Sequence, residues 1–362
     1  MDNARKGFWF AIAASTALGL GGCGGSGDGG AATGNLTIGL TDGPVEYAYS
    51  VVVEFTGIEI KPVGGPPEVY NECDGDPSTT NDVCTIDLLQ YQGEERTIYF
   101  SDEVAAGDYE WIRLLVNAQP NTIDSYITFE EGGEMCSLFI PSGAQTGLKV
   151  QSPFTVTANG VTDYTLDFDV RKSITNPPGL AGEPSRAATC TDEYLMKPVI
   201  RIVDTTETGA ISGVIDESLL QTEVMNAAEE MVPACEQDEA TMEYINAAVY
   251  VFWEDGAAPP AADDIDIGAN GADLGGLDPI ATASVKYDSE LPGYVYEVGY
   301  LLADETYRVA LTCDADADMR DSDEFDPEDP DASADVFRFL SERDDVIVTV
   351  NEAADGDLPV VQ

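Results

Sequence analysis

The sequence predicts an all-β protein: two antiparallel β-sandwich domains behind a signal peptide and a flexible tether. From residue 35 onward, short apolar runs alternate with polar residues and are separated by turn residues such as Asp-Gly-Pro and Asn-Gly, which is the pattern of short strands. The body is about 330 residues long, which suits two domains of ordinary size. Substantial cores are expected, because 43% of the chain is apolar.

The first 22 residues have the features of an export signal. Two basic residues precede an apolar run, Phe8 to Leu20, that is shorter than the roughly 20 residues of a membrane-spanning helix. Leu20-Gly21-Gly22-Cys23 resembles the bacterial lipobox, and the resemblance implies cleavage before Cys23 and acylation of that cysteine, which anchors the protein stably through several acyl chains. Gly24 stands where an inner-membrane retention signal has Asp, which favours the outer membrane. The alternative is an ordinary signal peptide with an incidental cysteine.

We therefore divide the chain into five segments. Gly-rich residues after Cys23 form a tether that spans about 20 Å, and the polar residues from Asp204 to Thr208 form a linker between the sandwiches. The predicted segments are residues 1–22, the lipoprotein signal peptide; 23–34, the lipidated cysteine and tether; 35–205, the first β-sandwich; 206–352, the second β-sandwich; and 353–362, an acidic, frayed tail.

The charge of the chain is extreme. Sixty-eight acidic residues face 16 basic ones, which gives a net charge of −52 and a pI near 4.1. Nucleic acid is therefore excluded as a partner, and anionic lipid head groups are poor ones. Two explanations fit and can hold together: a surface suited to a saline habitat, where salt screens the self-repulsion, or binding of multivalent cations. The chain has no histidine, which removes Ser-His-Asp and Cys-His catalysis and imidazole metal ligands.

Six cysteines remain once Cys23 is lipidated, and an even number in an exported chain predicts disulfides. They are Cys73, Cys84, Cys136, Cys190, Cys235 and Cys313. If the domains are not cross-linked, Cys235 pairs with Cys313, and the other four allow three pairings. We favour Cys73–Cys84, because both lie in one polar loop, together with Cys136–Cys190.

The first domain opens with Leu36, Ile38 and Leu40 alternating with polar residues, a strand that ends at Asp42-Gly43-Pro44. A second strand is predicted over residues 51–60, with a bulge or bend at Gly57. Further strands are predicted at residues 109–116, 126–129 and 196–203.

The strongest indication of a hairpin in this domain is Asn159-Gly160. These residues supply the positive φ angles of a type I′ turn between residues 154–158 and 161–170. In the second arm, the apolar residues at even positions 164–170 are expected to face the core, and the polar residues at odd positions 163–169 to face water.

Five motifs in the first domain share their residue types and order with one family. They are Leu40–Pro44 (Leu-Thr-Asp-Gly-Pro), Gly107–Tyr109 with Ile112–Leu114, Ile140–Lys149, Leu166–Asp169 and Leu195–Arg201. Together they resemble the bacterial domain of unknown function 4382 family, with a departure at Gly43, where Ala is usual. The resemblance covers most of the first domain. It implies a β-rich exported domain, commonly found on lipoproteins, and it implies no activity.

Basic residues gather in or beside these motifs, although the chain has few of them. Two interpretations remain open: internal ion pairs that set strand register, for example with Asp167 or Asp169, or a basic groove for an anionic ligand such as an acidic sugar. The anion-binding candidates are Arg113, Lys149, Arg171, Lys197 and Arg201, with Lys172 beside them. Ser142 is interpreted as a turn residue, because no histidine exists to activate it as a nucleophile.

A new strand pattern begins in the second domain. It contains an opening strand at residues 209–216, a central Ala-Val-Tyr strand at 247–252, and a "Gly-Tyr … Tyr-x-Val" hairpin formed by 293–298 and 307–311. This order resembles the transthyretin-like, carboxypeptidase-regulatory type of β-sandwich. By analogy, the resemblance implies a spacer or a polysaccharide- or surface-binding module. A short helix is predicted between residues 216 and 231.

An acidic stretch follows Cys313. Aspartates recur there at nearly alternate positions, and converging carboxylates suit Ca²⁺, which takes six to eight oxygen ligands. The candidate ligands are Asp314, Asp316, Asp318, Asp321 and Asp323, with a second acidic loop at residues 263–266. Met319 stands where an EF-hand loop needs Gly, so the alternative is a solvated loop of a halophilic protein.

These observations favour a non-catalytic, lipid-anchored protein of the cell envelope, on the periplasmic or surface face of the outer membrane. We expect a binding, adhesion or structural role, with Ca²⁺ as a candidate stabilising ion. The expected partners are the membrane, through the lipid anchor, and an envelope polysaccharide or surface protein. The alternative is a carbohydrate-binding or glycosidase-type protein that uses two carboxylates, but carboxylates are so numerous that no pair stands out.

Overall fold

The computed structural model describes the body of the chain from residue 32 to residue 358, with gaps. Residues 32–362 form one compact unit. The described residues are 32–45, 48–71, 83–141, 147–175, 190, 194–225, 230–238, 241–254, 278–290, 293–315, 318, 337–350 and 352–358. The lipobox and Cys23 lie outside them.

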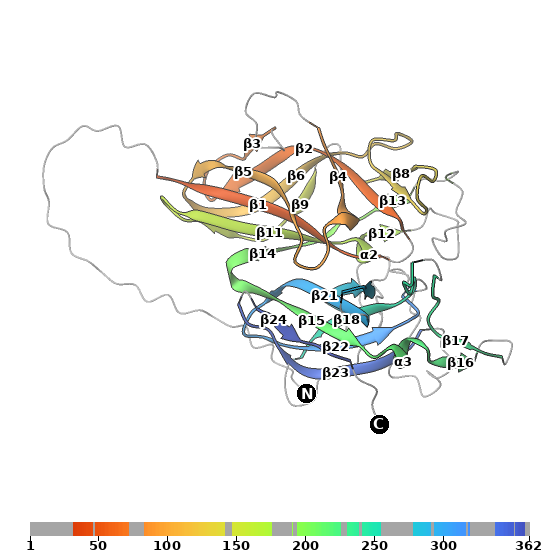
Figure 1. The fold of residues 1–362 in the computed structure, drawn as a ribbon. Helices are drawn as coiled ribbons and strands as arrows, with labels where there is room; N and C mark the ends of the chain where they lie inside the picture. The colour runs from red at the N-terminus through yellow and green to blue at the C-terminus, as the bar shows by residue number, and fades with distance from the viewer. Residues whose placement is uncertain are drawn as a thin grey trace, which may run out of the picture. The chain divides into compact units, whose positions relative to one another are not determined.

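The first half of this unit contains two sheets, and the smaller one has the strand order β14-β11-β1-β5. β11 lies parallel to β1, and each of these two strands has an antiparallel neighbour on its other side. Figure 1 shows β1, β11 and β14 running side by side. The strands are β1 (Thr33–Gly43), β5 (Thr97–Ala105), β11 (Val161–Asp169) and β14 (Val199–Asp204).

The larger sheet of this half has ten strands and is centred on two long antiparallel strands, β2 (Ser50–Pro62) and β6 (Gly107–Asn117). Its path is β10-β6-β2-β7-β8-β13-β12, while β3 and β4 pair with β2, and β9 pairs with β6. The bend predicted at Gly57 is confirmed, because Gly57 has a φ of 146° at a register shift within β2. The shorter strands are β3 (Glu68–Tyr70), β4 (Cys84–Asp87), β7 (Tyr126–Thr128), β8 (Cys136–Phe139), β9 (Leu148–Val150), β10 (Phe154–Val156), β12 (Ile174–Thr175) and β13 (Tyr194–Met196).

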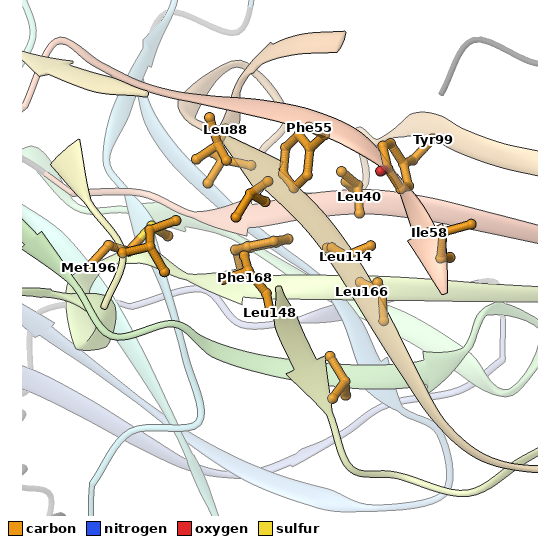
Figure 2. Close-up of a cluster of buried hydrophobic side chains, with 14 of the residues drawn as sticks. Leu40, Phe55, Ile58, Leu88, Tyr99, Leu114, Leu148, Leu166, Phe168 and Met196 are labelled. Atoms are coloured by element: carbon orange, nitrogen blue, oxygen red, sulfur yellow. The ribbon is translucent and has the colours of Figure 1, made fainter. Parts of the chain in front are cut away.

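The two sheets of the first half enclose its hydrophobic core (Figure 2). Leu40 and Leu166 belong to the smaller sheet, Phe55 and Leu114 belong to the larger one, and all four side chains are fully buried. The rings of Phe55 and Phe168 have centroids 6.3 Å apart across this core. The apolar residues at alternate strand positions therefore interdigitate between two sheets, as in a β-sandwich.

The second half builds another pair of sheets, with the orders β20-β21-β15-β24 and β19-β18-β22-β23, and a separate two-stranded ribbon, β16-β17. Fully buried side chains such as Ile211, Val249 and Val309 form its core. Its strands are β15 (Thr208–Ile215), β16 (Glu223–Met225), β17 (Met231–Pro233), β18 (Ala248–Trp253), β19 (Ala281–Ser284), β20 (Lys286–Asp288), β21 (Gly293–Leu302), β22 (Thr306–Thr312), β23 (Phe339–Ile347) and β24 (Ala353–Asp355).

The helical elements of the described residues are few and short. The predicted helix after residue 216 is present as α3 (Glu217–Leu220), and a 3₁₀ turn, η2 (Thr205–Glu207), occupies the predicted linker. The first half contributes η1 (Leu88–Gln90) and α2 (Val170–Ser173). In the described part of the chain, no helix has the length and apolar character needed to cross a membrane.

The predicted all-β fold class is confirmed, with two refinements. Among the described strands, three pairs are parallel: β1 with β11, β8 with β13, and β15 with β24. The prediction that residues 353–362 only fray is wrong for the first part of that segment. β24 pairs with β15, and Leu358 is fully buried, so apolar burial ties this part of the acidic tail to the second core.

Two predicted hairpins are wrong, for one reason. β10 pairs with β6 in the larger sheet, whereas β11 pairs with β1 and β14 in the smaller one, so the turn at Asn159-Gly160 connects two sheets. Similarly, β21 and β22 belong to different sheets of the second half. Alternation shows which side chains point inward, but both sheets of a sandwich face the same core, so alternation does not choose a strand's partner.

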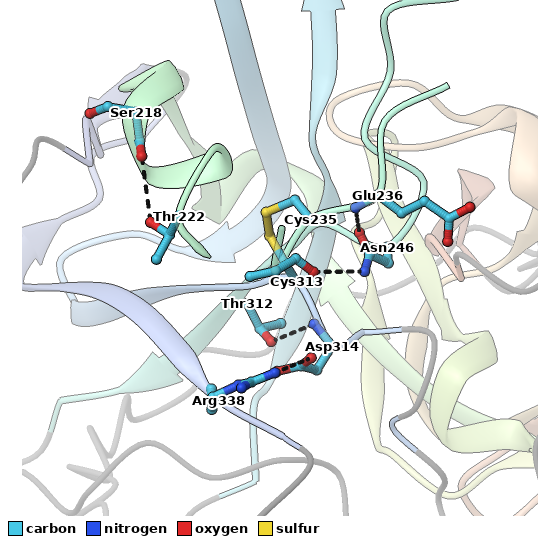
Figure 3. The surroundings of a disulfide bond; sticks show 10 residues. Ser218, Thr222, Cys235, Glu236, Asn246, Thr312, Cys313, Asp314 and Arg338 are labelled. Carbon is cyan, nitrogen blue, oxygen red and sulfur yellow. Dashed lines mark hydrogen bonds and ion pairs between the residues drawn. A yellow bond between two sulfur atoms is a disulfide. The ribbon is translucent and has the colours of Figure 1, made fainter. Parts of the chain in front are cut away.

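The disulfides Cys136–Cys190 and Cys235–Cys313 are present as predicted, with Cα–Cα distances of 4.7 and 4.9 Å. Cys84 is also disulfide-bonded, and Cys73 lies outside the described residues. The two bonds join positions 54 and 78 residues apart. Figure 3 shows how Cys235–Cys313 connects the segment after β17 to the end of β22.

Candidate functional site

Charged residues of the sequence motifs gather in two regions: the junction between the two halves, and the outer face of the larger sheet in the first half. Within the described residues, no strand of the first half pairs with a strand of the second. Side chains and loops therefore hold the junction together.

The first anchor of the junction is Arg171 on α2, which is 1% exposed. Its Nη1 donates a hydrogen bond to the carbonyl oxygen of Ala315 at 2.5 Å, and its Nη2 donates one to that of Pro44 at 3.4 Å. The guanidinium also lies 5.5 Å from the centroid of the Tyr250 ring, within the range of a cation–π contact. Arg171 was one of the anion-binding candidates; at this position it is buried and connects the two halves.

Lys172 and Glu94 add further contacts across the junction. Lys172 Nζ donates a hydrogen bond to the carbonyl oxygen of Pro279 and lies 3.6 Å from Asp169. The backbone N–H of Glu94 donates to Glu297 Oε1 at 2.8 Å, and the hydroxyl of Tyr300 donates to the Glu94 carbonyl at 2.8 Å. These bonds bring together residues more than 100 positions apart, so the two halves are joined at several separate points.

The polar face of β11, which was expected to meet water, meets the second half instead. A cavity of about 280 Å³ lies there, and its walls include Asp167, Asp169 and Arg201 from the first half and Trp253 from the second. A groove of about 750 Å³, lined by residues of both halves, also lies at the junction. Because the second half covers β11, its alternating aspartates lie at an internal boundary.

Ion pairs across β11 account for two more of the basic residues. Arg201 on β14 is the register partner of Asp167, and its Nε donates to Asp167 Oδ2 at 2.5 Å. Arg96 forms a two-pronged contact with Asp163, with distances of 2.7 and 2.6 Å. Arg201 was an anion-binding candidate, and the alternative was an internal ion pair that sets strand register. The structure shows Arg201 in such an ion pair, with Asp167.

Two aspartates of the family motifs hold protons more readily than usual. Burial raises the pKa of Asp42 well above its ordinary value, and the negative charges of Asp167 and Asp169 raise it further. Asp42 Oδ1 accepts the backbone N–H of Val170 at 3.2 Å, while Oδ2 is buried and has no hydrogen-bond partner among the residues that the structure describes. Burial also raises the pKa of Asp167, although Arg201 opposes that effect. Asp42 is thus buried, whereas Asp167 is partly buried and lines the junction cavity.

Arg113 and Lys149, in contrast, meet on the outer face of the larger sheet. They are register partners on β6 and β9, and both lie over the ring of Trp111. The Arg113 Cζ is 4.7 Å and the Lys149 Nζ is 4.4 Å from the ring centroid. Arg113 Nη1 also forms an ion pair with Glu59 of β2. We call Trp111, Arg113 and Lys149 the Trp111 cluster.

The Trp111 cluster is accessible. Lys149 is exposed, and Trp111 and Arg113 are partly exposed. Among the described residues, no carboxylate lies within 4.0 Å of Lys149 Nζ. Lys197, the last of the anion-binding candidates, is exposed in the connection between β13 and β14, and its backbone N–H donates to the Ser173 carbonyl at 2.8 Å.

The predicted calcium ligands lie largely outside the described residues: Asp316, Asp321 and Asp323 belong to this group, as does the loop at 263–266. Asp314 forms an ion pair with Arg338 at 3.3 Å (Figure 3), and Asp318, which is 3% exposed, accepts a hydrogen bond from Tyr250. Burial raises the pKa of Asp314, and Arg338 opposes that rise. No group of three or more potential metal-binding side chains occurs in the part of the chain that the structure describes. The calcium site stays a prediction.

Trp111 was missed as a functional candidate, although the sequence contained an indication of it. It stands two residues before Arg113, so on an extended strand both side chains emerge on the same face. The contact of Lys149 with this ring was not readable, because it depends on the pairing of β9 with β6.

Comparison with known proteins supports part of this picture. Residues 33–198 match the family described as "Domain of unknown function (DUF4382)". No curated protein matches the chain, and no solved structure does. The match covers the first half, including the Trp111 cluster and the motifs at Asp42 and Asp167. The first half of this chain thus contains a domain of that family of unknown function.

Proposed function

We propose that this chain is a non-catalytic protein of the cell envelope, anchored by lipid at Cys23, with a binding, adhesion or structural role. The anchor rests on the lipobox motif in the sequence. The role rests on how the body uses its charged residues.

The observation that carries the proposal is that the sequestered charges hold the fold together. Arg171 and Lys172 bond to backbone carbonyls of the second half, and Arg201 forms an ion pair with its strand neighbour Asp167. A body joined in this way forms one compact unit, which suits a protein that presents a surface at the membrane on a flexible tether.

The family-motif carboxyls of Asp42 and Asp167, whose pKa values are raised, support binding over hydrolysis. A glycosidase needs two carboxyls that flank the scissile bond of a bound sugar, one of them as a general acid. Asp42 has a raised pKa, but its side chain is buried and Oδ1 accepts a backbone N–H. Asp167 is engaged by Arg201. Neither carboxyl is therefore placed like a general acid facing a substrate.

The anchor is tested by labelling cells with an alkyne fatty acid and separating membranes with a phase-separating detergent. The wild type should carry the label and enter the detergent phase, and Cys23→Ala should lose the label. Ser26→Ala, in the tether, is the matched control and should behave as the wild type. Label retained on Cys23→Ala would remove the lipid anchor from the proposal.

The role is tested by incubating the full chain with insoluble envelope polysaccharide. We expect the protein to sediment with the polysaccharide, and we expect no new reducing sugar ends in the supernatant. Release of reducing ends that increases with time would establish the alternative, a polysaccharide-processing enzyme, and would overturn the non-catalytic role.

A further inference from the structure

We infer that the Trp111 cluster is a binding site for an acidic saccharide on the outer face of the larger sheet. The inference rests on the proposed function in one respect: it supplies the ligand class for a body proposed to bind at the envelope. Nothing in the family description assigns a ligand to these residues.

The cluster is fixed by backbone pairing. Strand register places Glu59, Arg113 and Lys149 in one row across β2, β6 and β9, and Val69 on β3 continues the row beyond Glu59. Trp111 lies on the same face of β6 as Arg113, because they are two residues apart on an extended strand. A site carried on paired strands is preorganised, which reduces the entropy lost when a ligand binds.

The cations in the cluster keep hydrogen-bond donors for a ligand. Arg113 uses Nη1 for Glu59, and among the described residues its Nη2 makes no hydrogen bond. Lys149 is exposed, lies over the indole ring and has no described carboxylate partner. The ring thus holds two cationic groups side by side, and both have N–H groups that can donate hydrogen bonds to an anionic oxygen.

The local charge favours an anion, in spite of the net charge of −52. Two charged residues on β2 are register partners of the cluster: Lys61 is opposite Trp111, and Glu59 is opposite Arg113. Lys61 forms an ion pair with Glu110, and Glu59 forms one with Arg113. These two pairs cancel, and Lys149 leaves a net charge of +1. Charges more than about 8 Å away are largely screened at physiological ionic strength, so a bound anionic group responds chiefly to the cluster.

The aromatic and apolar parts of the surface favour a sugar over a simple anion. Trp111 is partly exposed, and Val69, which lies in the row of Arg113 and Lys149, is 52% exposed. A pyranose ring offers C–H faces that pack on indole and apolar side chains, while its carboxylate or sulfate group reaches Lys149 and Arg113. An inorganic anion would use the cations alone and would leave the exposed parts of Trp111 and Val69 uncovered.

The test measures the binding of fluorescent oligosaccharides to the full chain by polarisation, at fixed ionic strength. The probes are an oligogalacturonate, a sulfated oligosaccharide and a neutral glucose oligomer, with inorganic sulfate as a competitor. We expect at least one acidic probe to bind, the neutral probe to bind at least about tenfold more weakly, and sulfate to compete poorly. Lys149→Ala and Trp111→Ala should each weaken acidic binding by about tenfold, the loss of one charge-assisted or aromatic contact.

Lys286→Ala is the matched control. Lys286 is exposed, as Lys149 is, and among the described residues no carboxylate oxygen lies within 4.0 Å of its Nζ. It lies on β20 in the second half, away from the Trp111 cluster. The variant should bind as the wild type. Equal binding by Lys149→Ala and the wild type, or equal binding of neutral and acidic probes, would overturn the inference. If Trp111→Ala unfolds, Lys149→Ala decides alone. Envelope polysaccharide that still binds Lys149→Ala normally would leave the proposed function intact and remove only this site.

Discussion

Arg171 donates a hydrogen bond to the carbonyl oxygen of Ala315 at 2.5 Å, although 144 residues separate them in the chain. Arg171 follows β11 in the first half, and Ala315 follows β22 in the second, so this bond crosses the junction. Burying a guanidinium is costly unless hydrogen bonds replace its lost water. For Arg171 the replacements come from carbonyls on both sides of the junction, those of Pro44 and Ala315.

Replacing Arg171 with Ala is therefore expected to uncouple the halves. We expect a loss of about 2–4 kcal/mol in the free energy of unfolding, because the Ala315 and Pro44 carbonyls lose their partner. Trp111 lies in the first half and Trp253 in the second, so urea unfolding is followed in Trp253→Phe and Trp111→Phe backgrounds that both also carry Trp9→Phe. The two transitions should coincide with Arg171 present and separate in Arg171→Ala. Coincident and unshifted transitions in the variant would show that the junction does not depend on this residue.

Asp42→Asn is expected to stabilise the protein at neutral pH. The pKa of Asp42 is raised in the folded state above its ordinary value of 3.8, which is the value expected in the unfolded chain. At pH values between the unfolded-state pKa and the folded-state pKa, the folded protein therefore binds more protons than the unfolded chain. Stability therefore falls as pH rises through this window, and the penalty is fully present above it. Asn keeps the acceptor for the Val170 N–H without the charge. Its melting temperature should exceed that of the wild type by a few degrees at pH 7, and the gain should shrink toward pH 4.

The matched control for that series is Asp102→Asn, because Asp102 is exposed on β5. Its melting temperature should stay close to that of the wild type at each pH. A constant difference between Asp42→Asn and the wild type from pH 4 to pH 8 would show that the buried charge is not the cause.

Removing the Cys235–Cys313 disulfide is expected to destabilise the second half selectively. The bond joins positions 78 residues apart. Closing a loop of that size lowers the conformational entropy of the unfolded chain and so adds up to about 4 kcal/mol to the free energy of unfolding. In an Arg171→Ala background, in which the halves are expected to unfold separately, Cys235→Ala/Cys313→Ala should move the transition reported by Trp253 to lower urea. In the same background, Cys136→Ala/Cys190→Ala should move the transition reported by Trp111. Equal shifts at both reporters in both variants would contradict this assignment of one bond to each half.

The acidic surface and the acidic loop after Cys313 give different expectations for how calcium changes the melting temperature. Salt should raise the melting temperature, because it screens the repulsion behind a net charge of −52. At high and constant NaCl, exchanging EDTA for millimolar CaCl₂ should raise it further only if the aspartates after Cys313 bind the ion in the folded state. A shift from NaCl with none from CaCl₂ would leave a screened surface and remove the calcium hypothesis. A melting temperature that does not change with NaCl would contradict the screening explanation.

Several features followed from the sequence alone because they depend on local order. Alternating apolar residues such as Leu36, Ile38 and Leu40 determined the all-β class and the inward faces. Gly57 marked the bend in β2 because a positive φ favours glycine. Cys235 and Cys313 pair as expected from an even count divided between two domains. The order of motifs in the first half was enough to indicate its family.

The tertiary structure alone decided which strand pairs with which, and so where the charges meet. The segment after Phe154 has the same alternation whether it turns back into its own sheet or crosses to the other, because both sheets face one core. Pairing across β6 and β9 is what brings Lys149 to Trp111. Burial of Arg171 depends on Ala315, 144 residues away. Long-range contacts of this kind produce no periodic pattern in the sequence. The sequence alone therefore could not show which anion-binding candidates make internal contacts, as Arg171 and Arg201 do, and which are exposed, as Lys149 and Lys197 are.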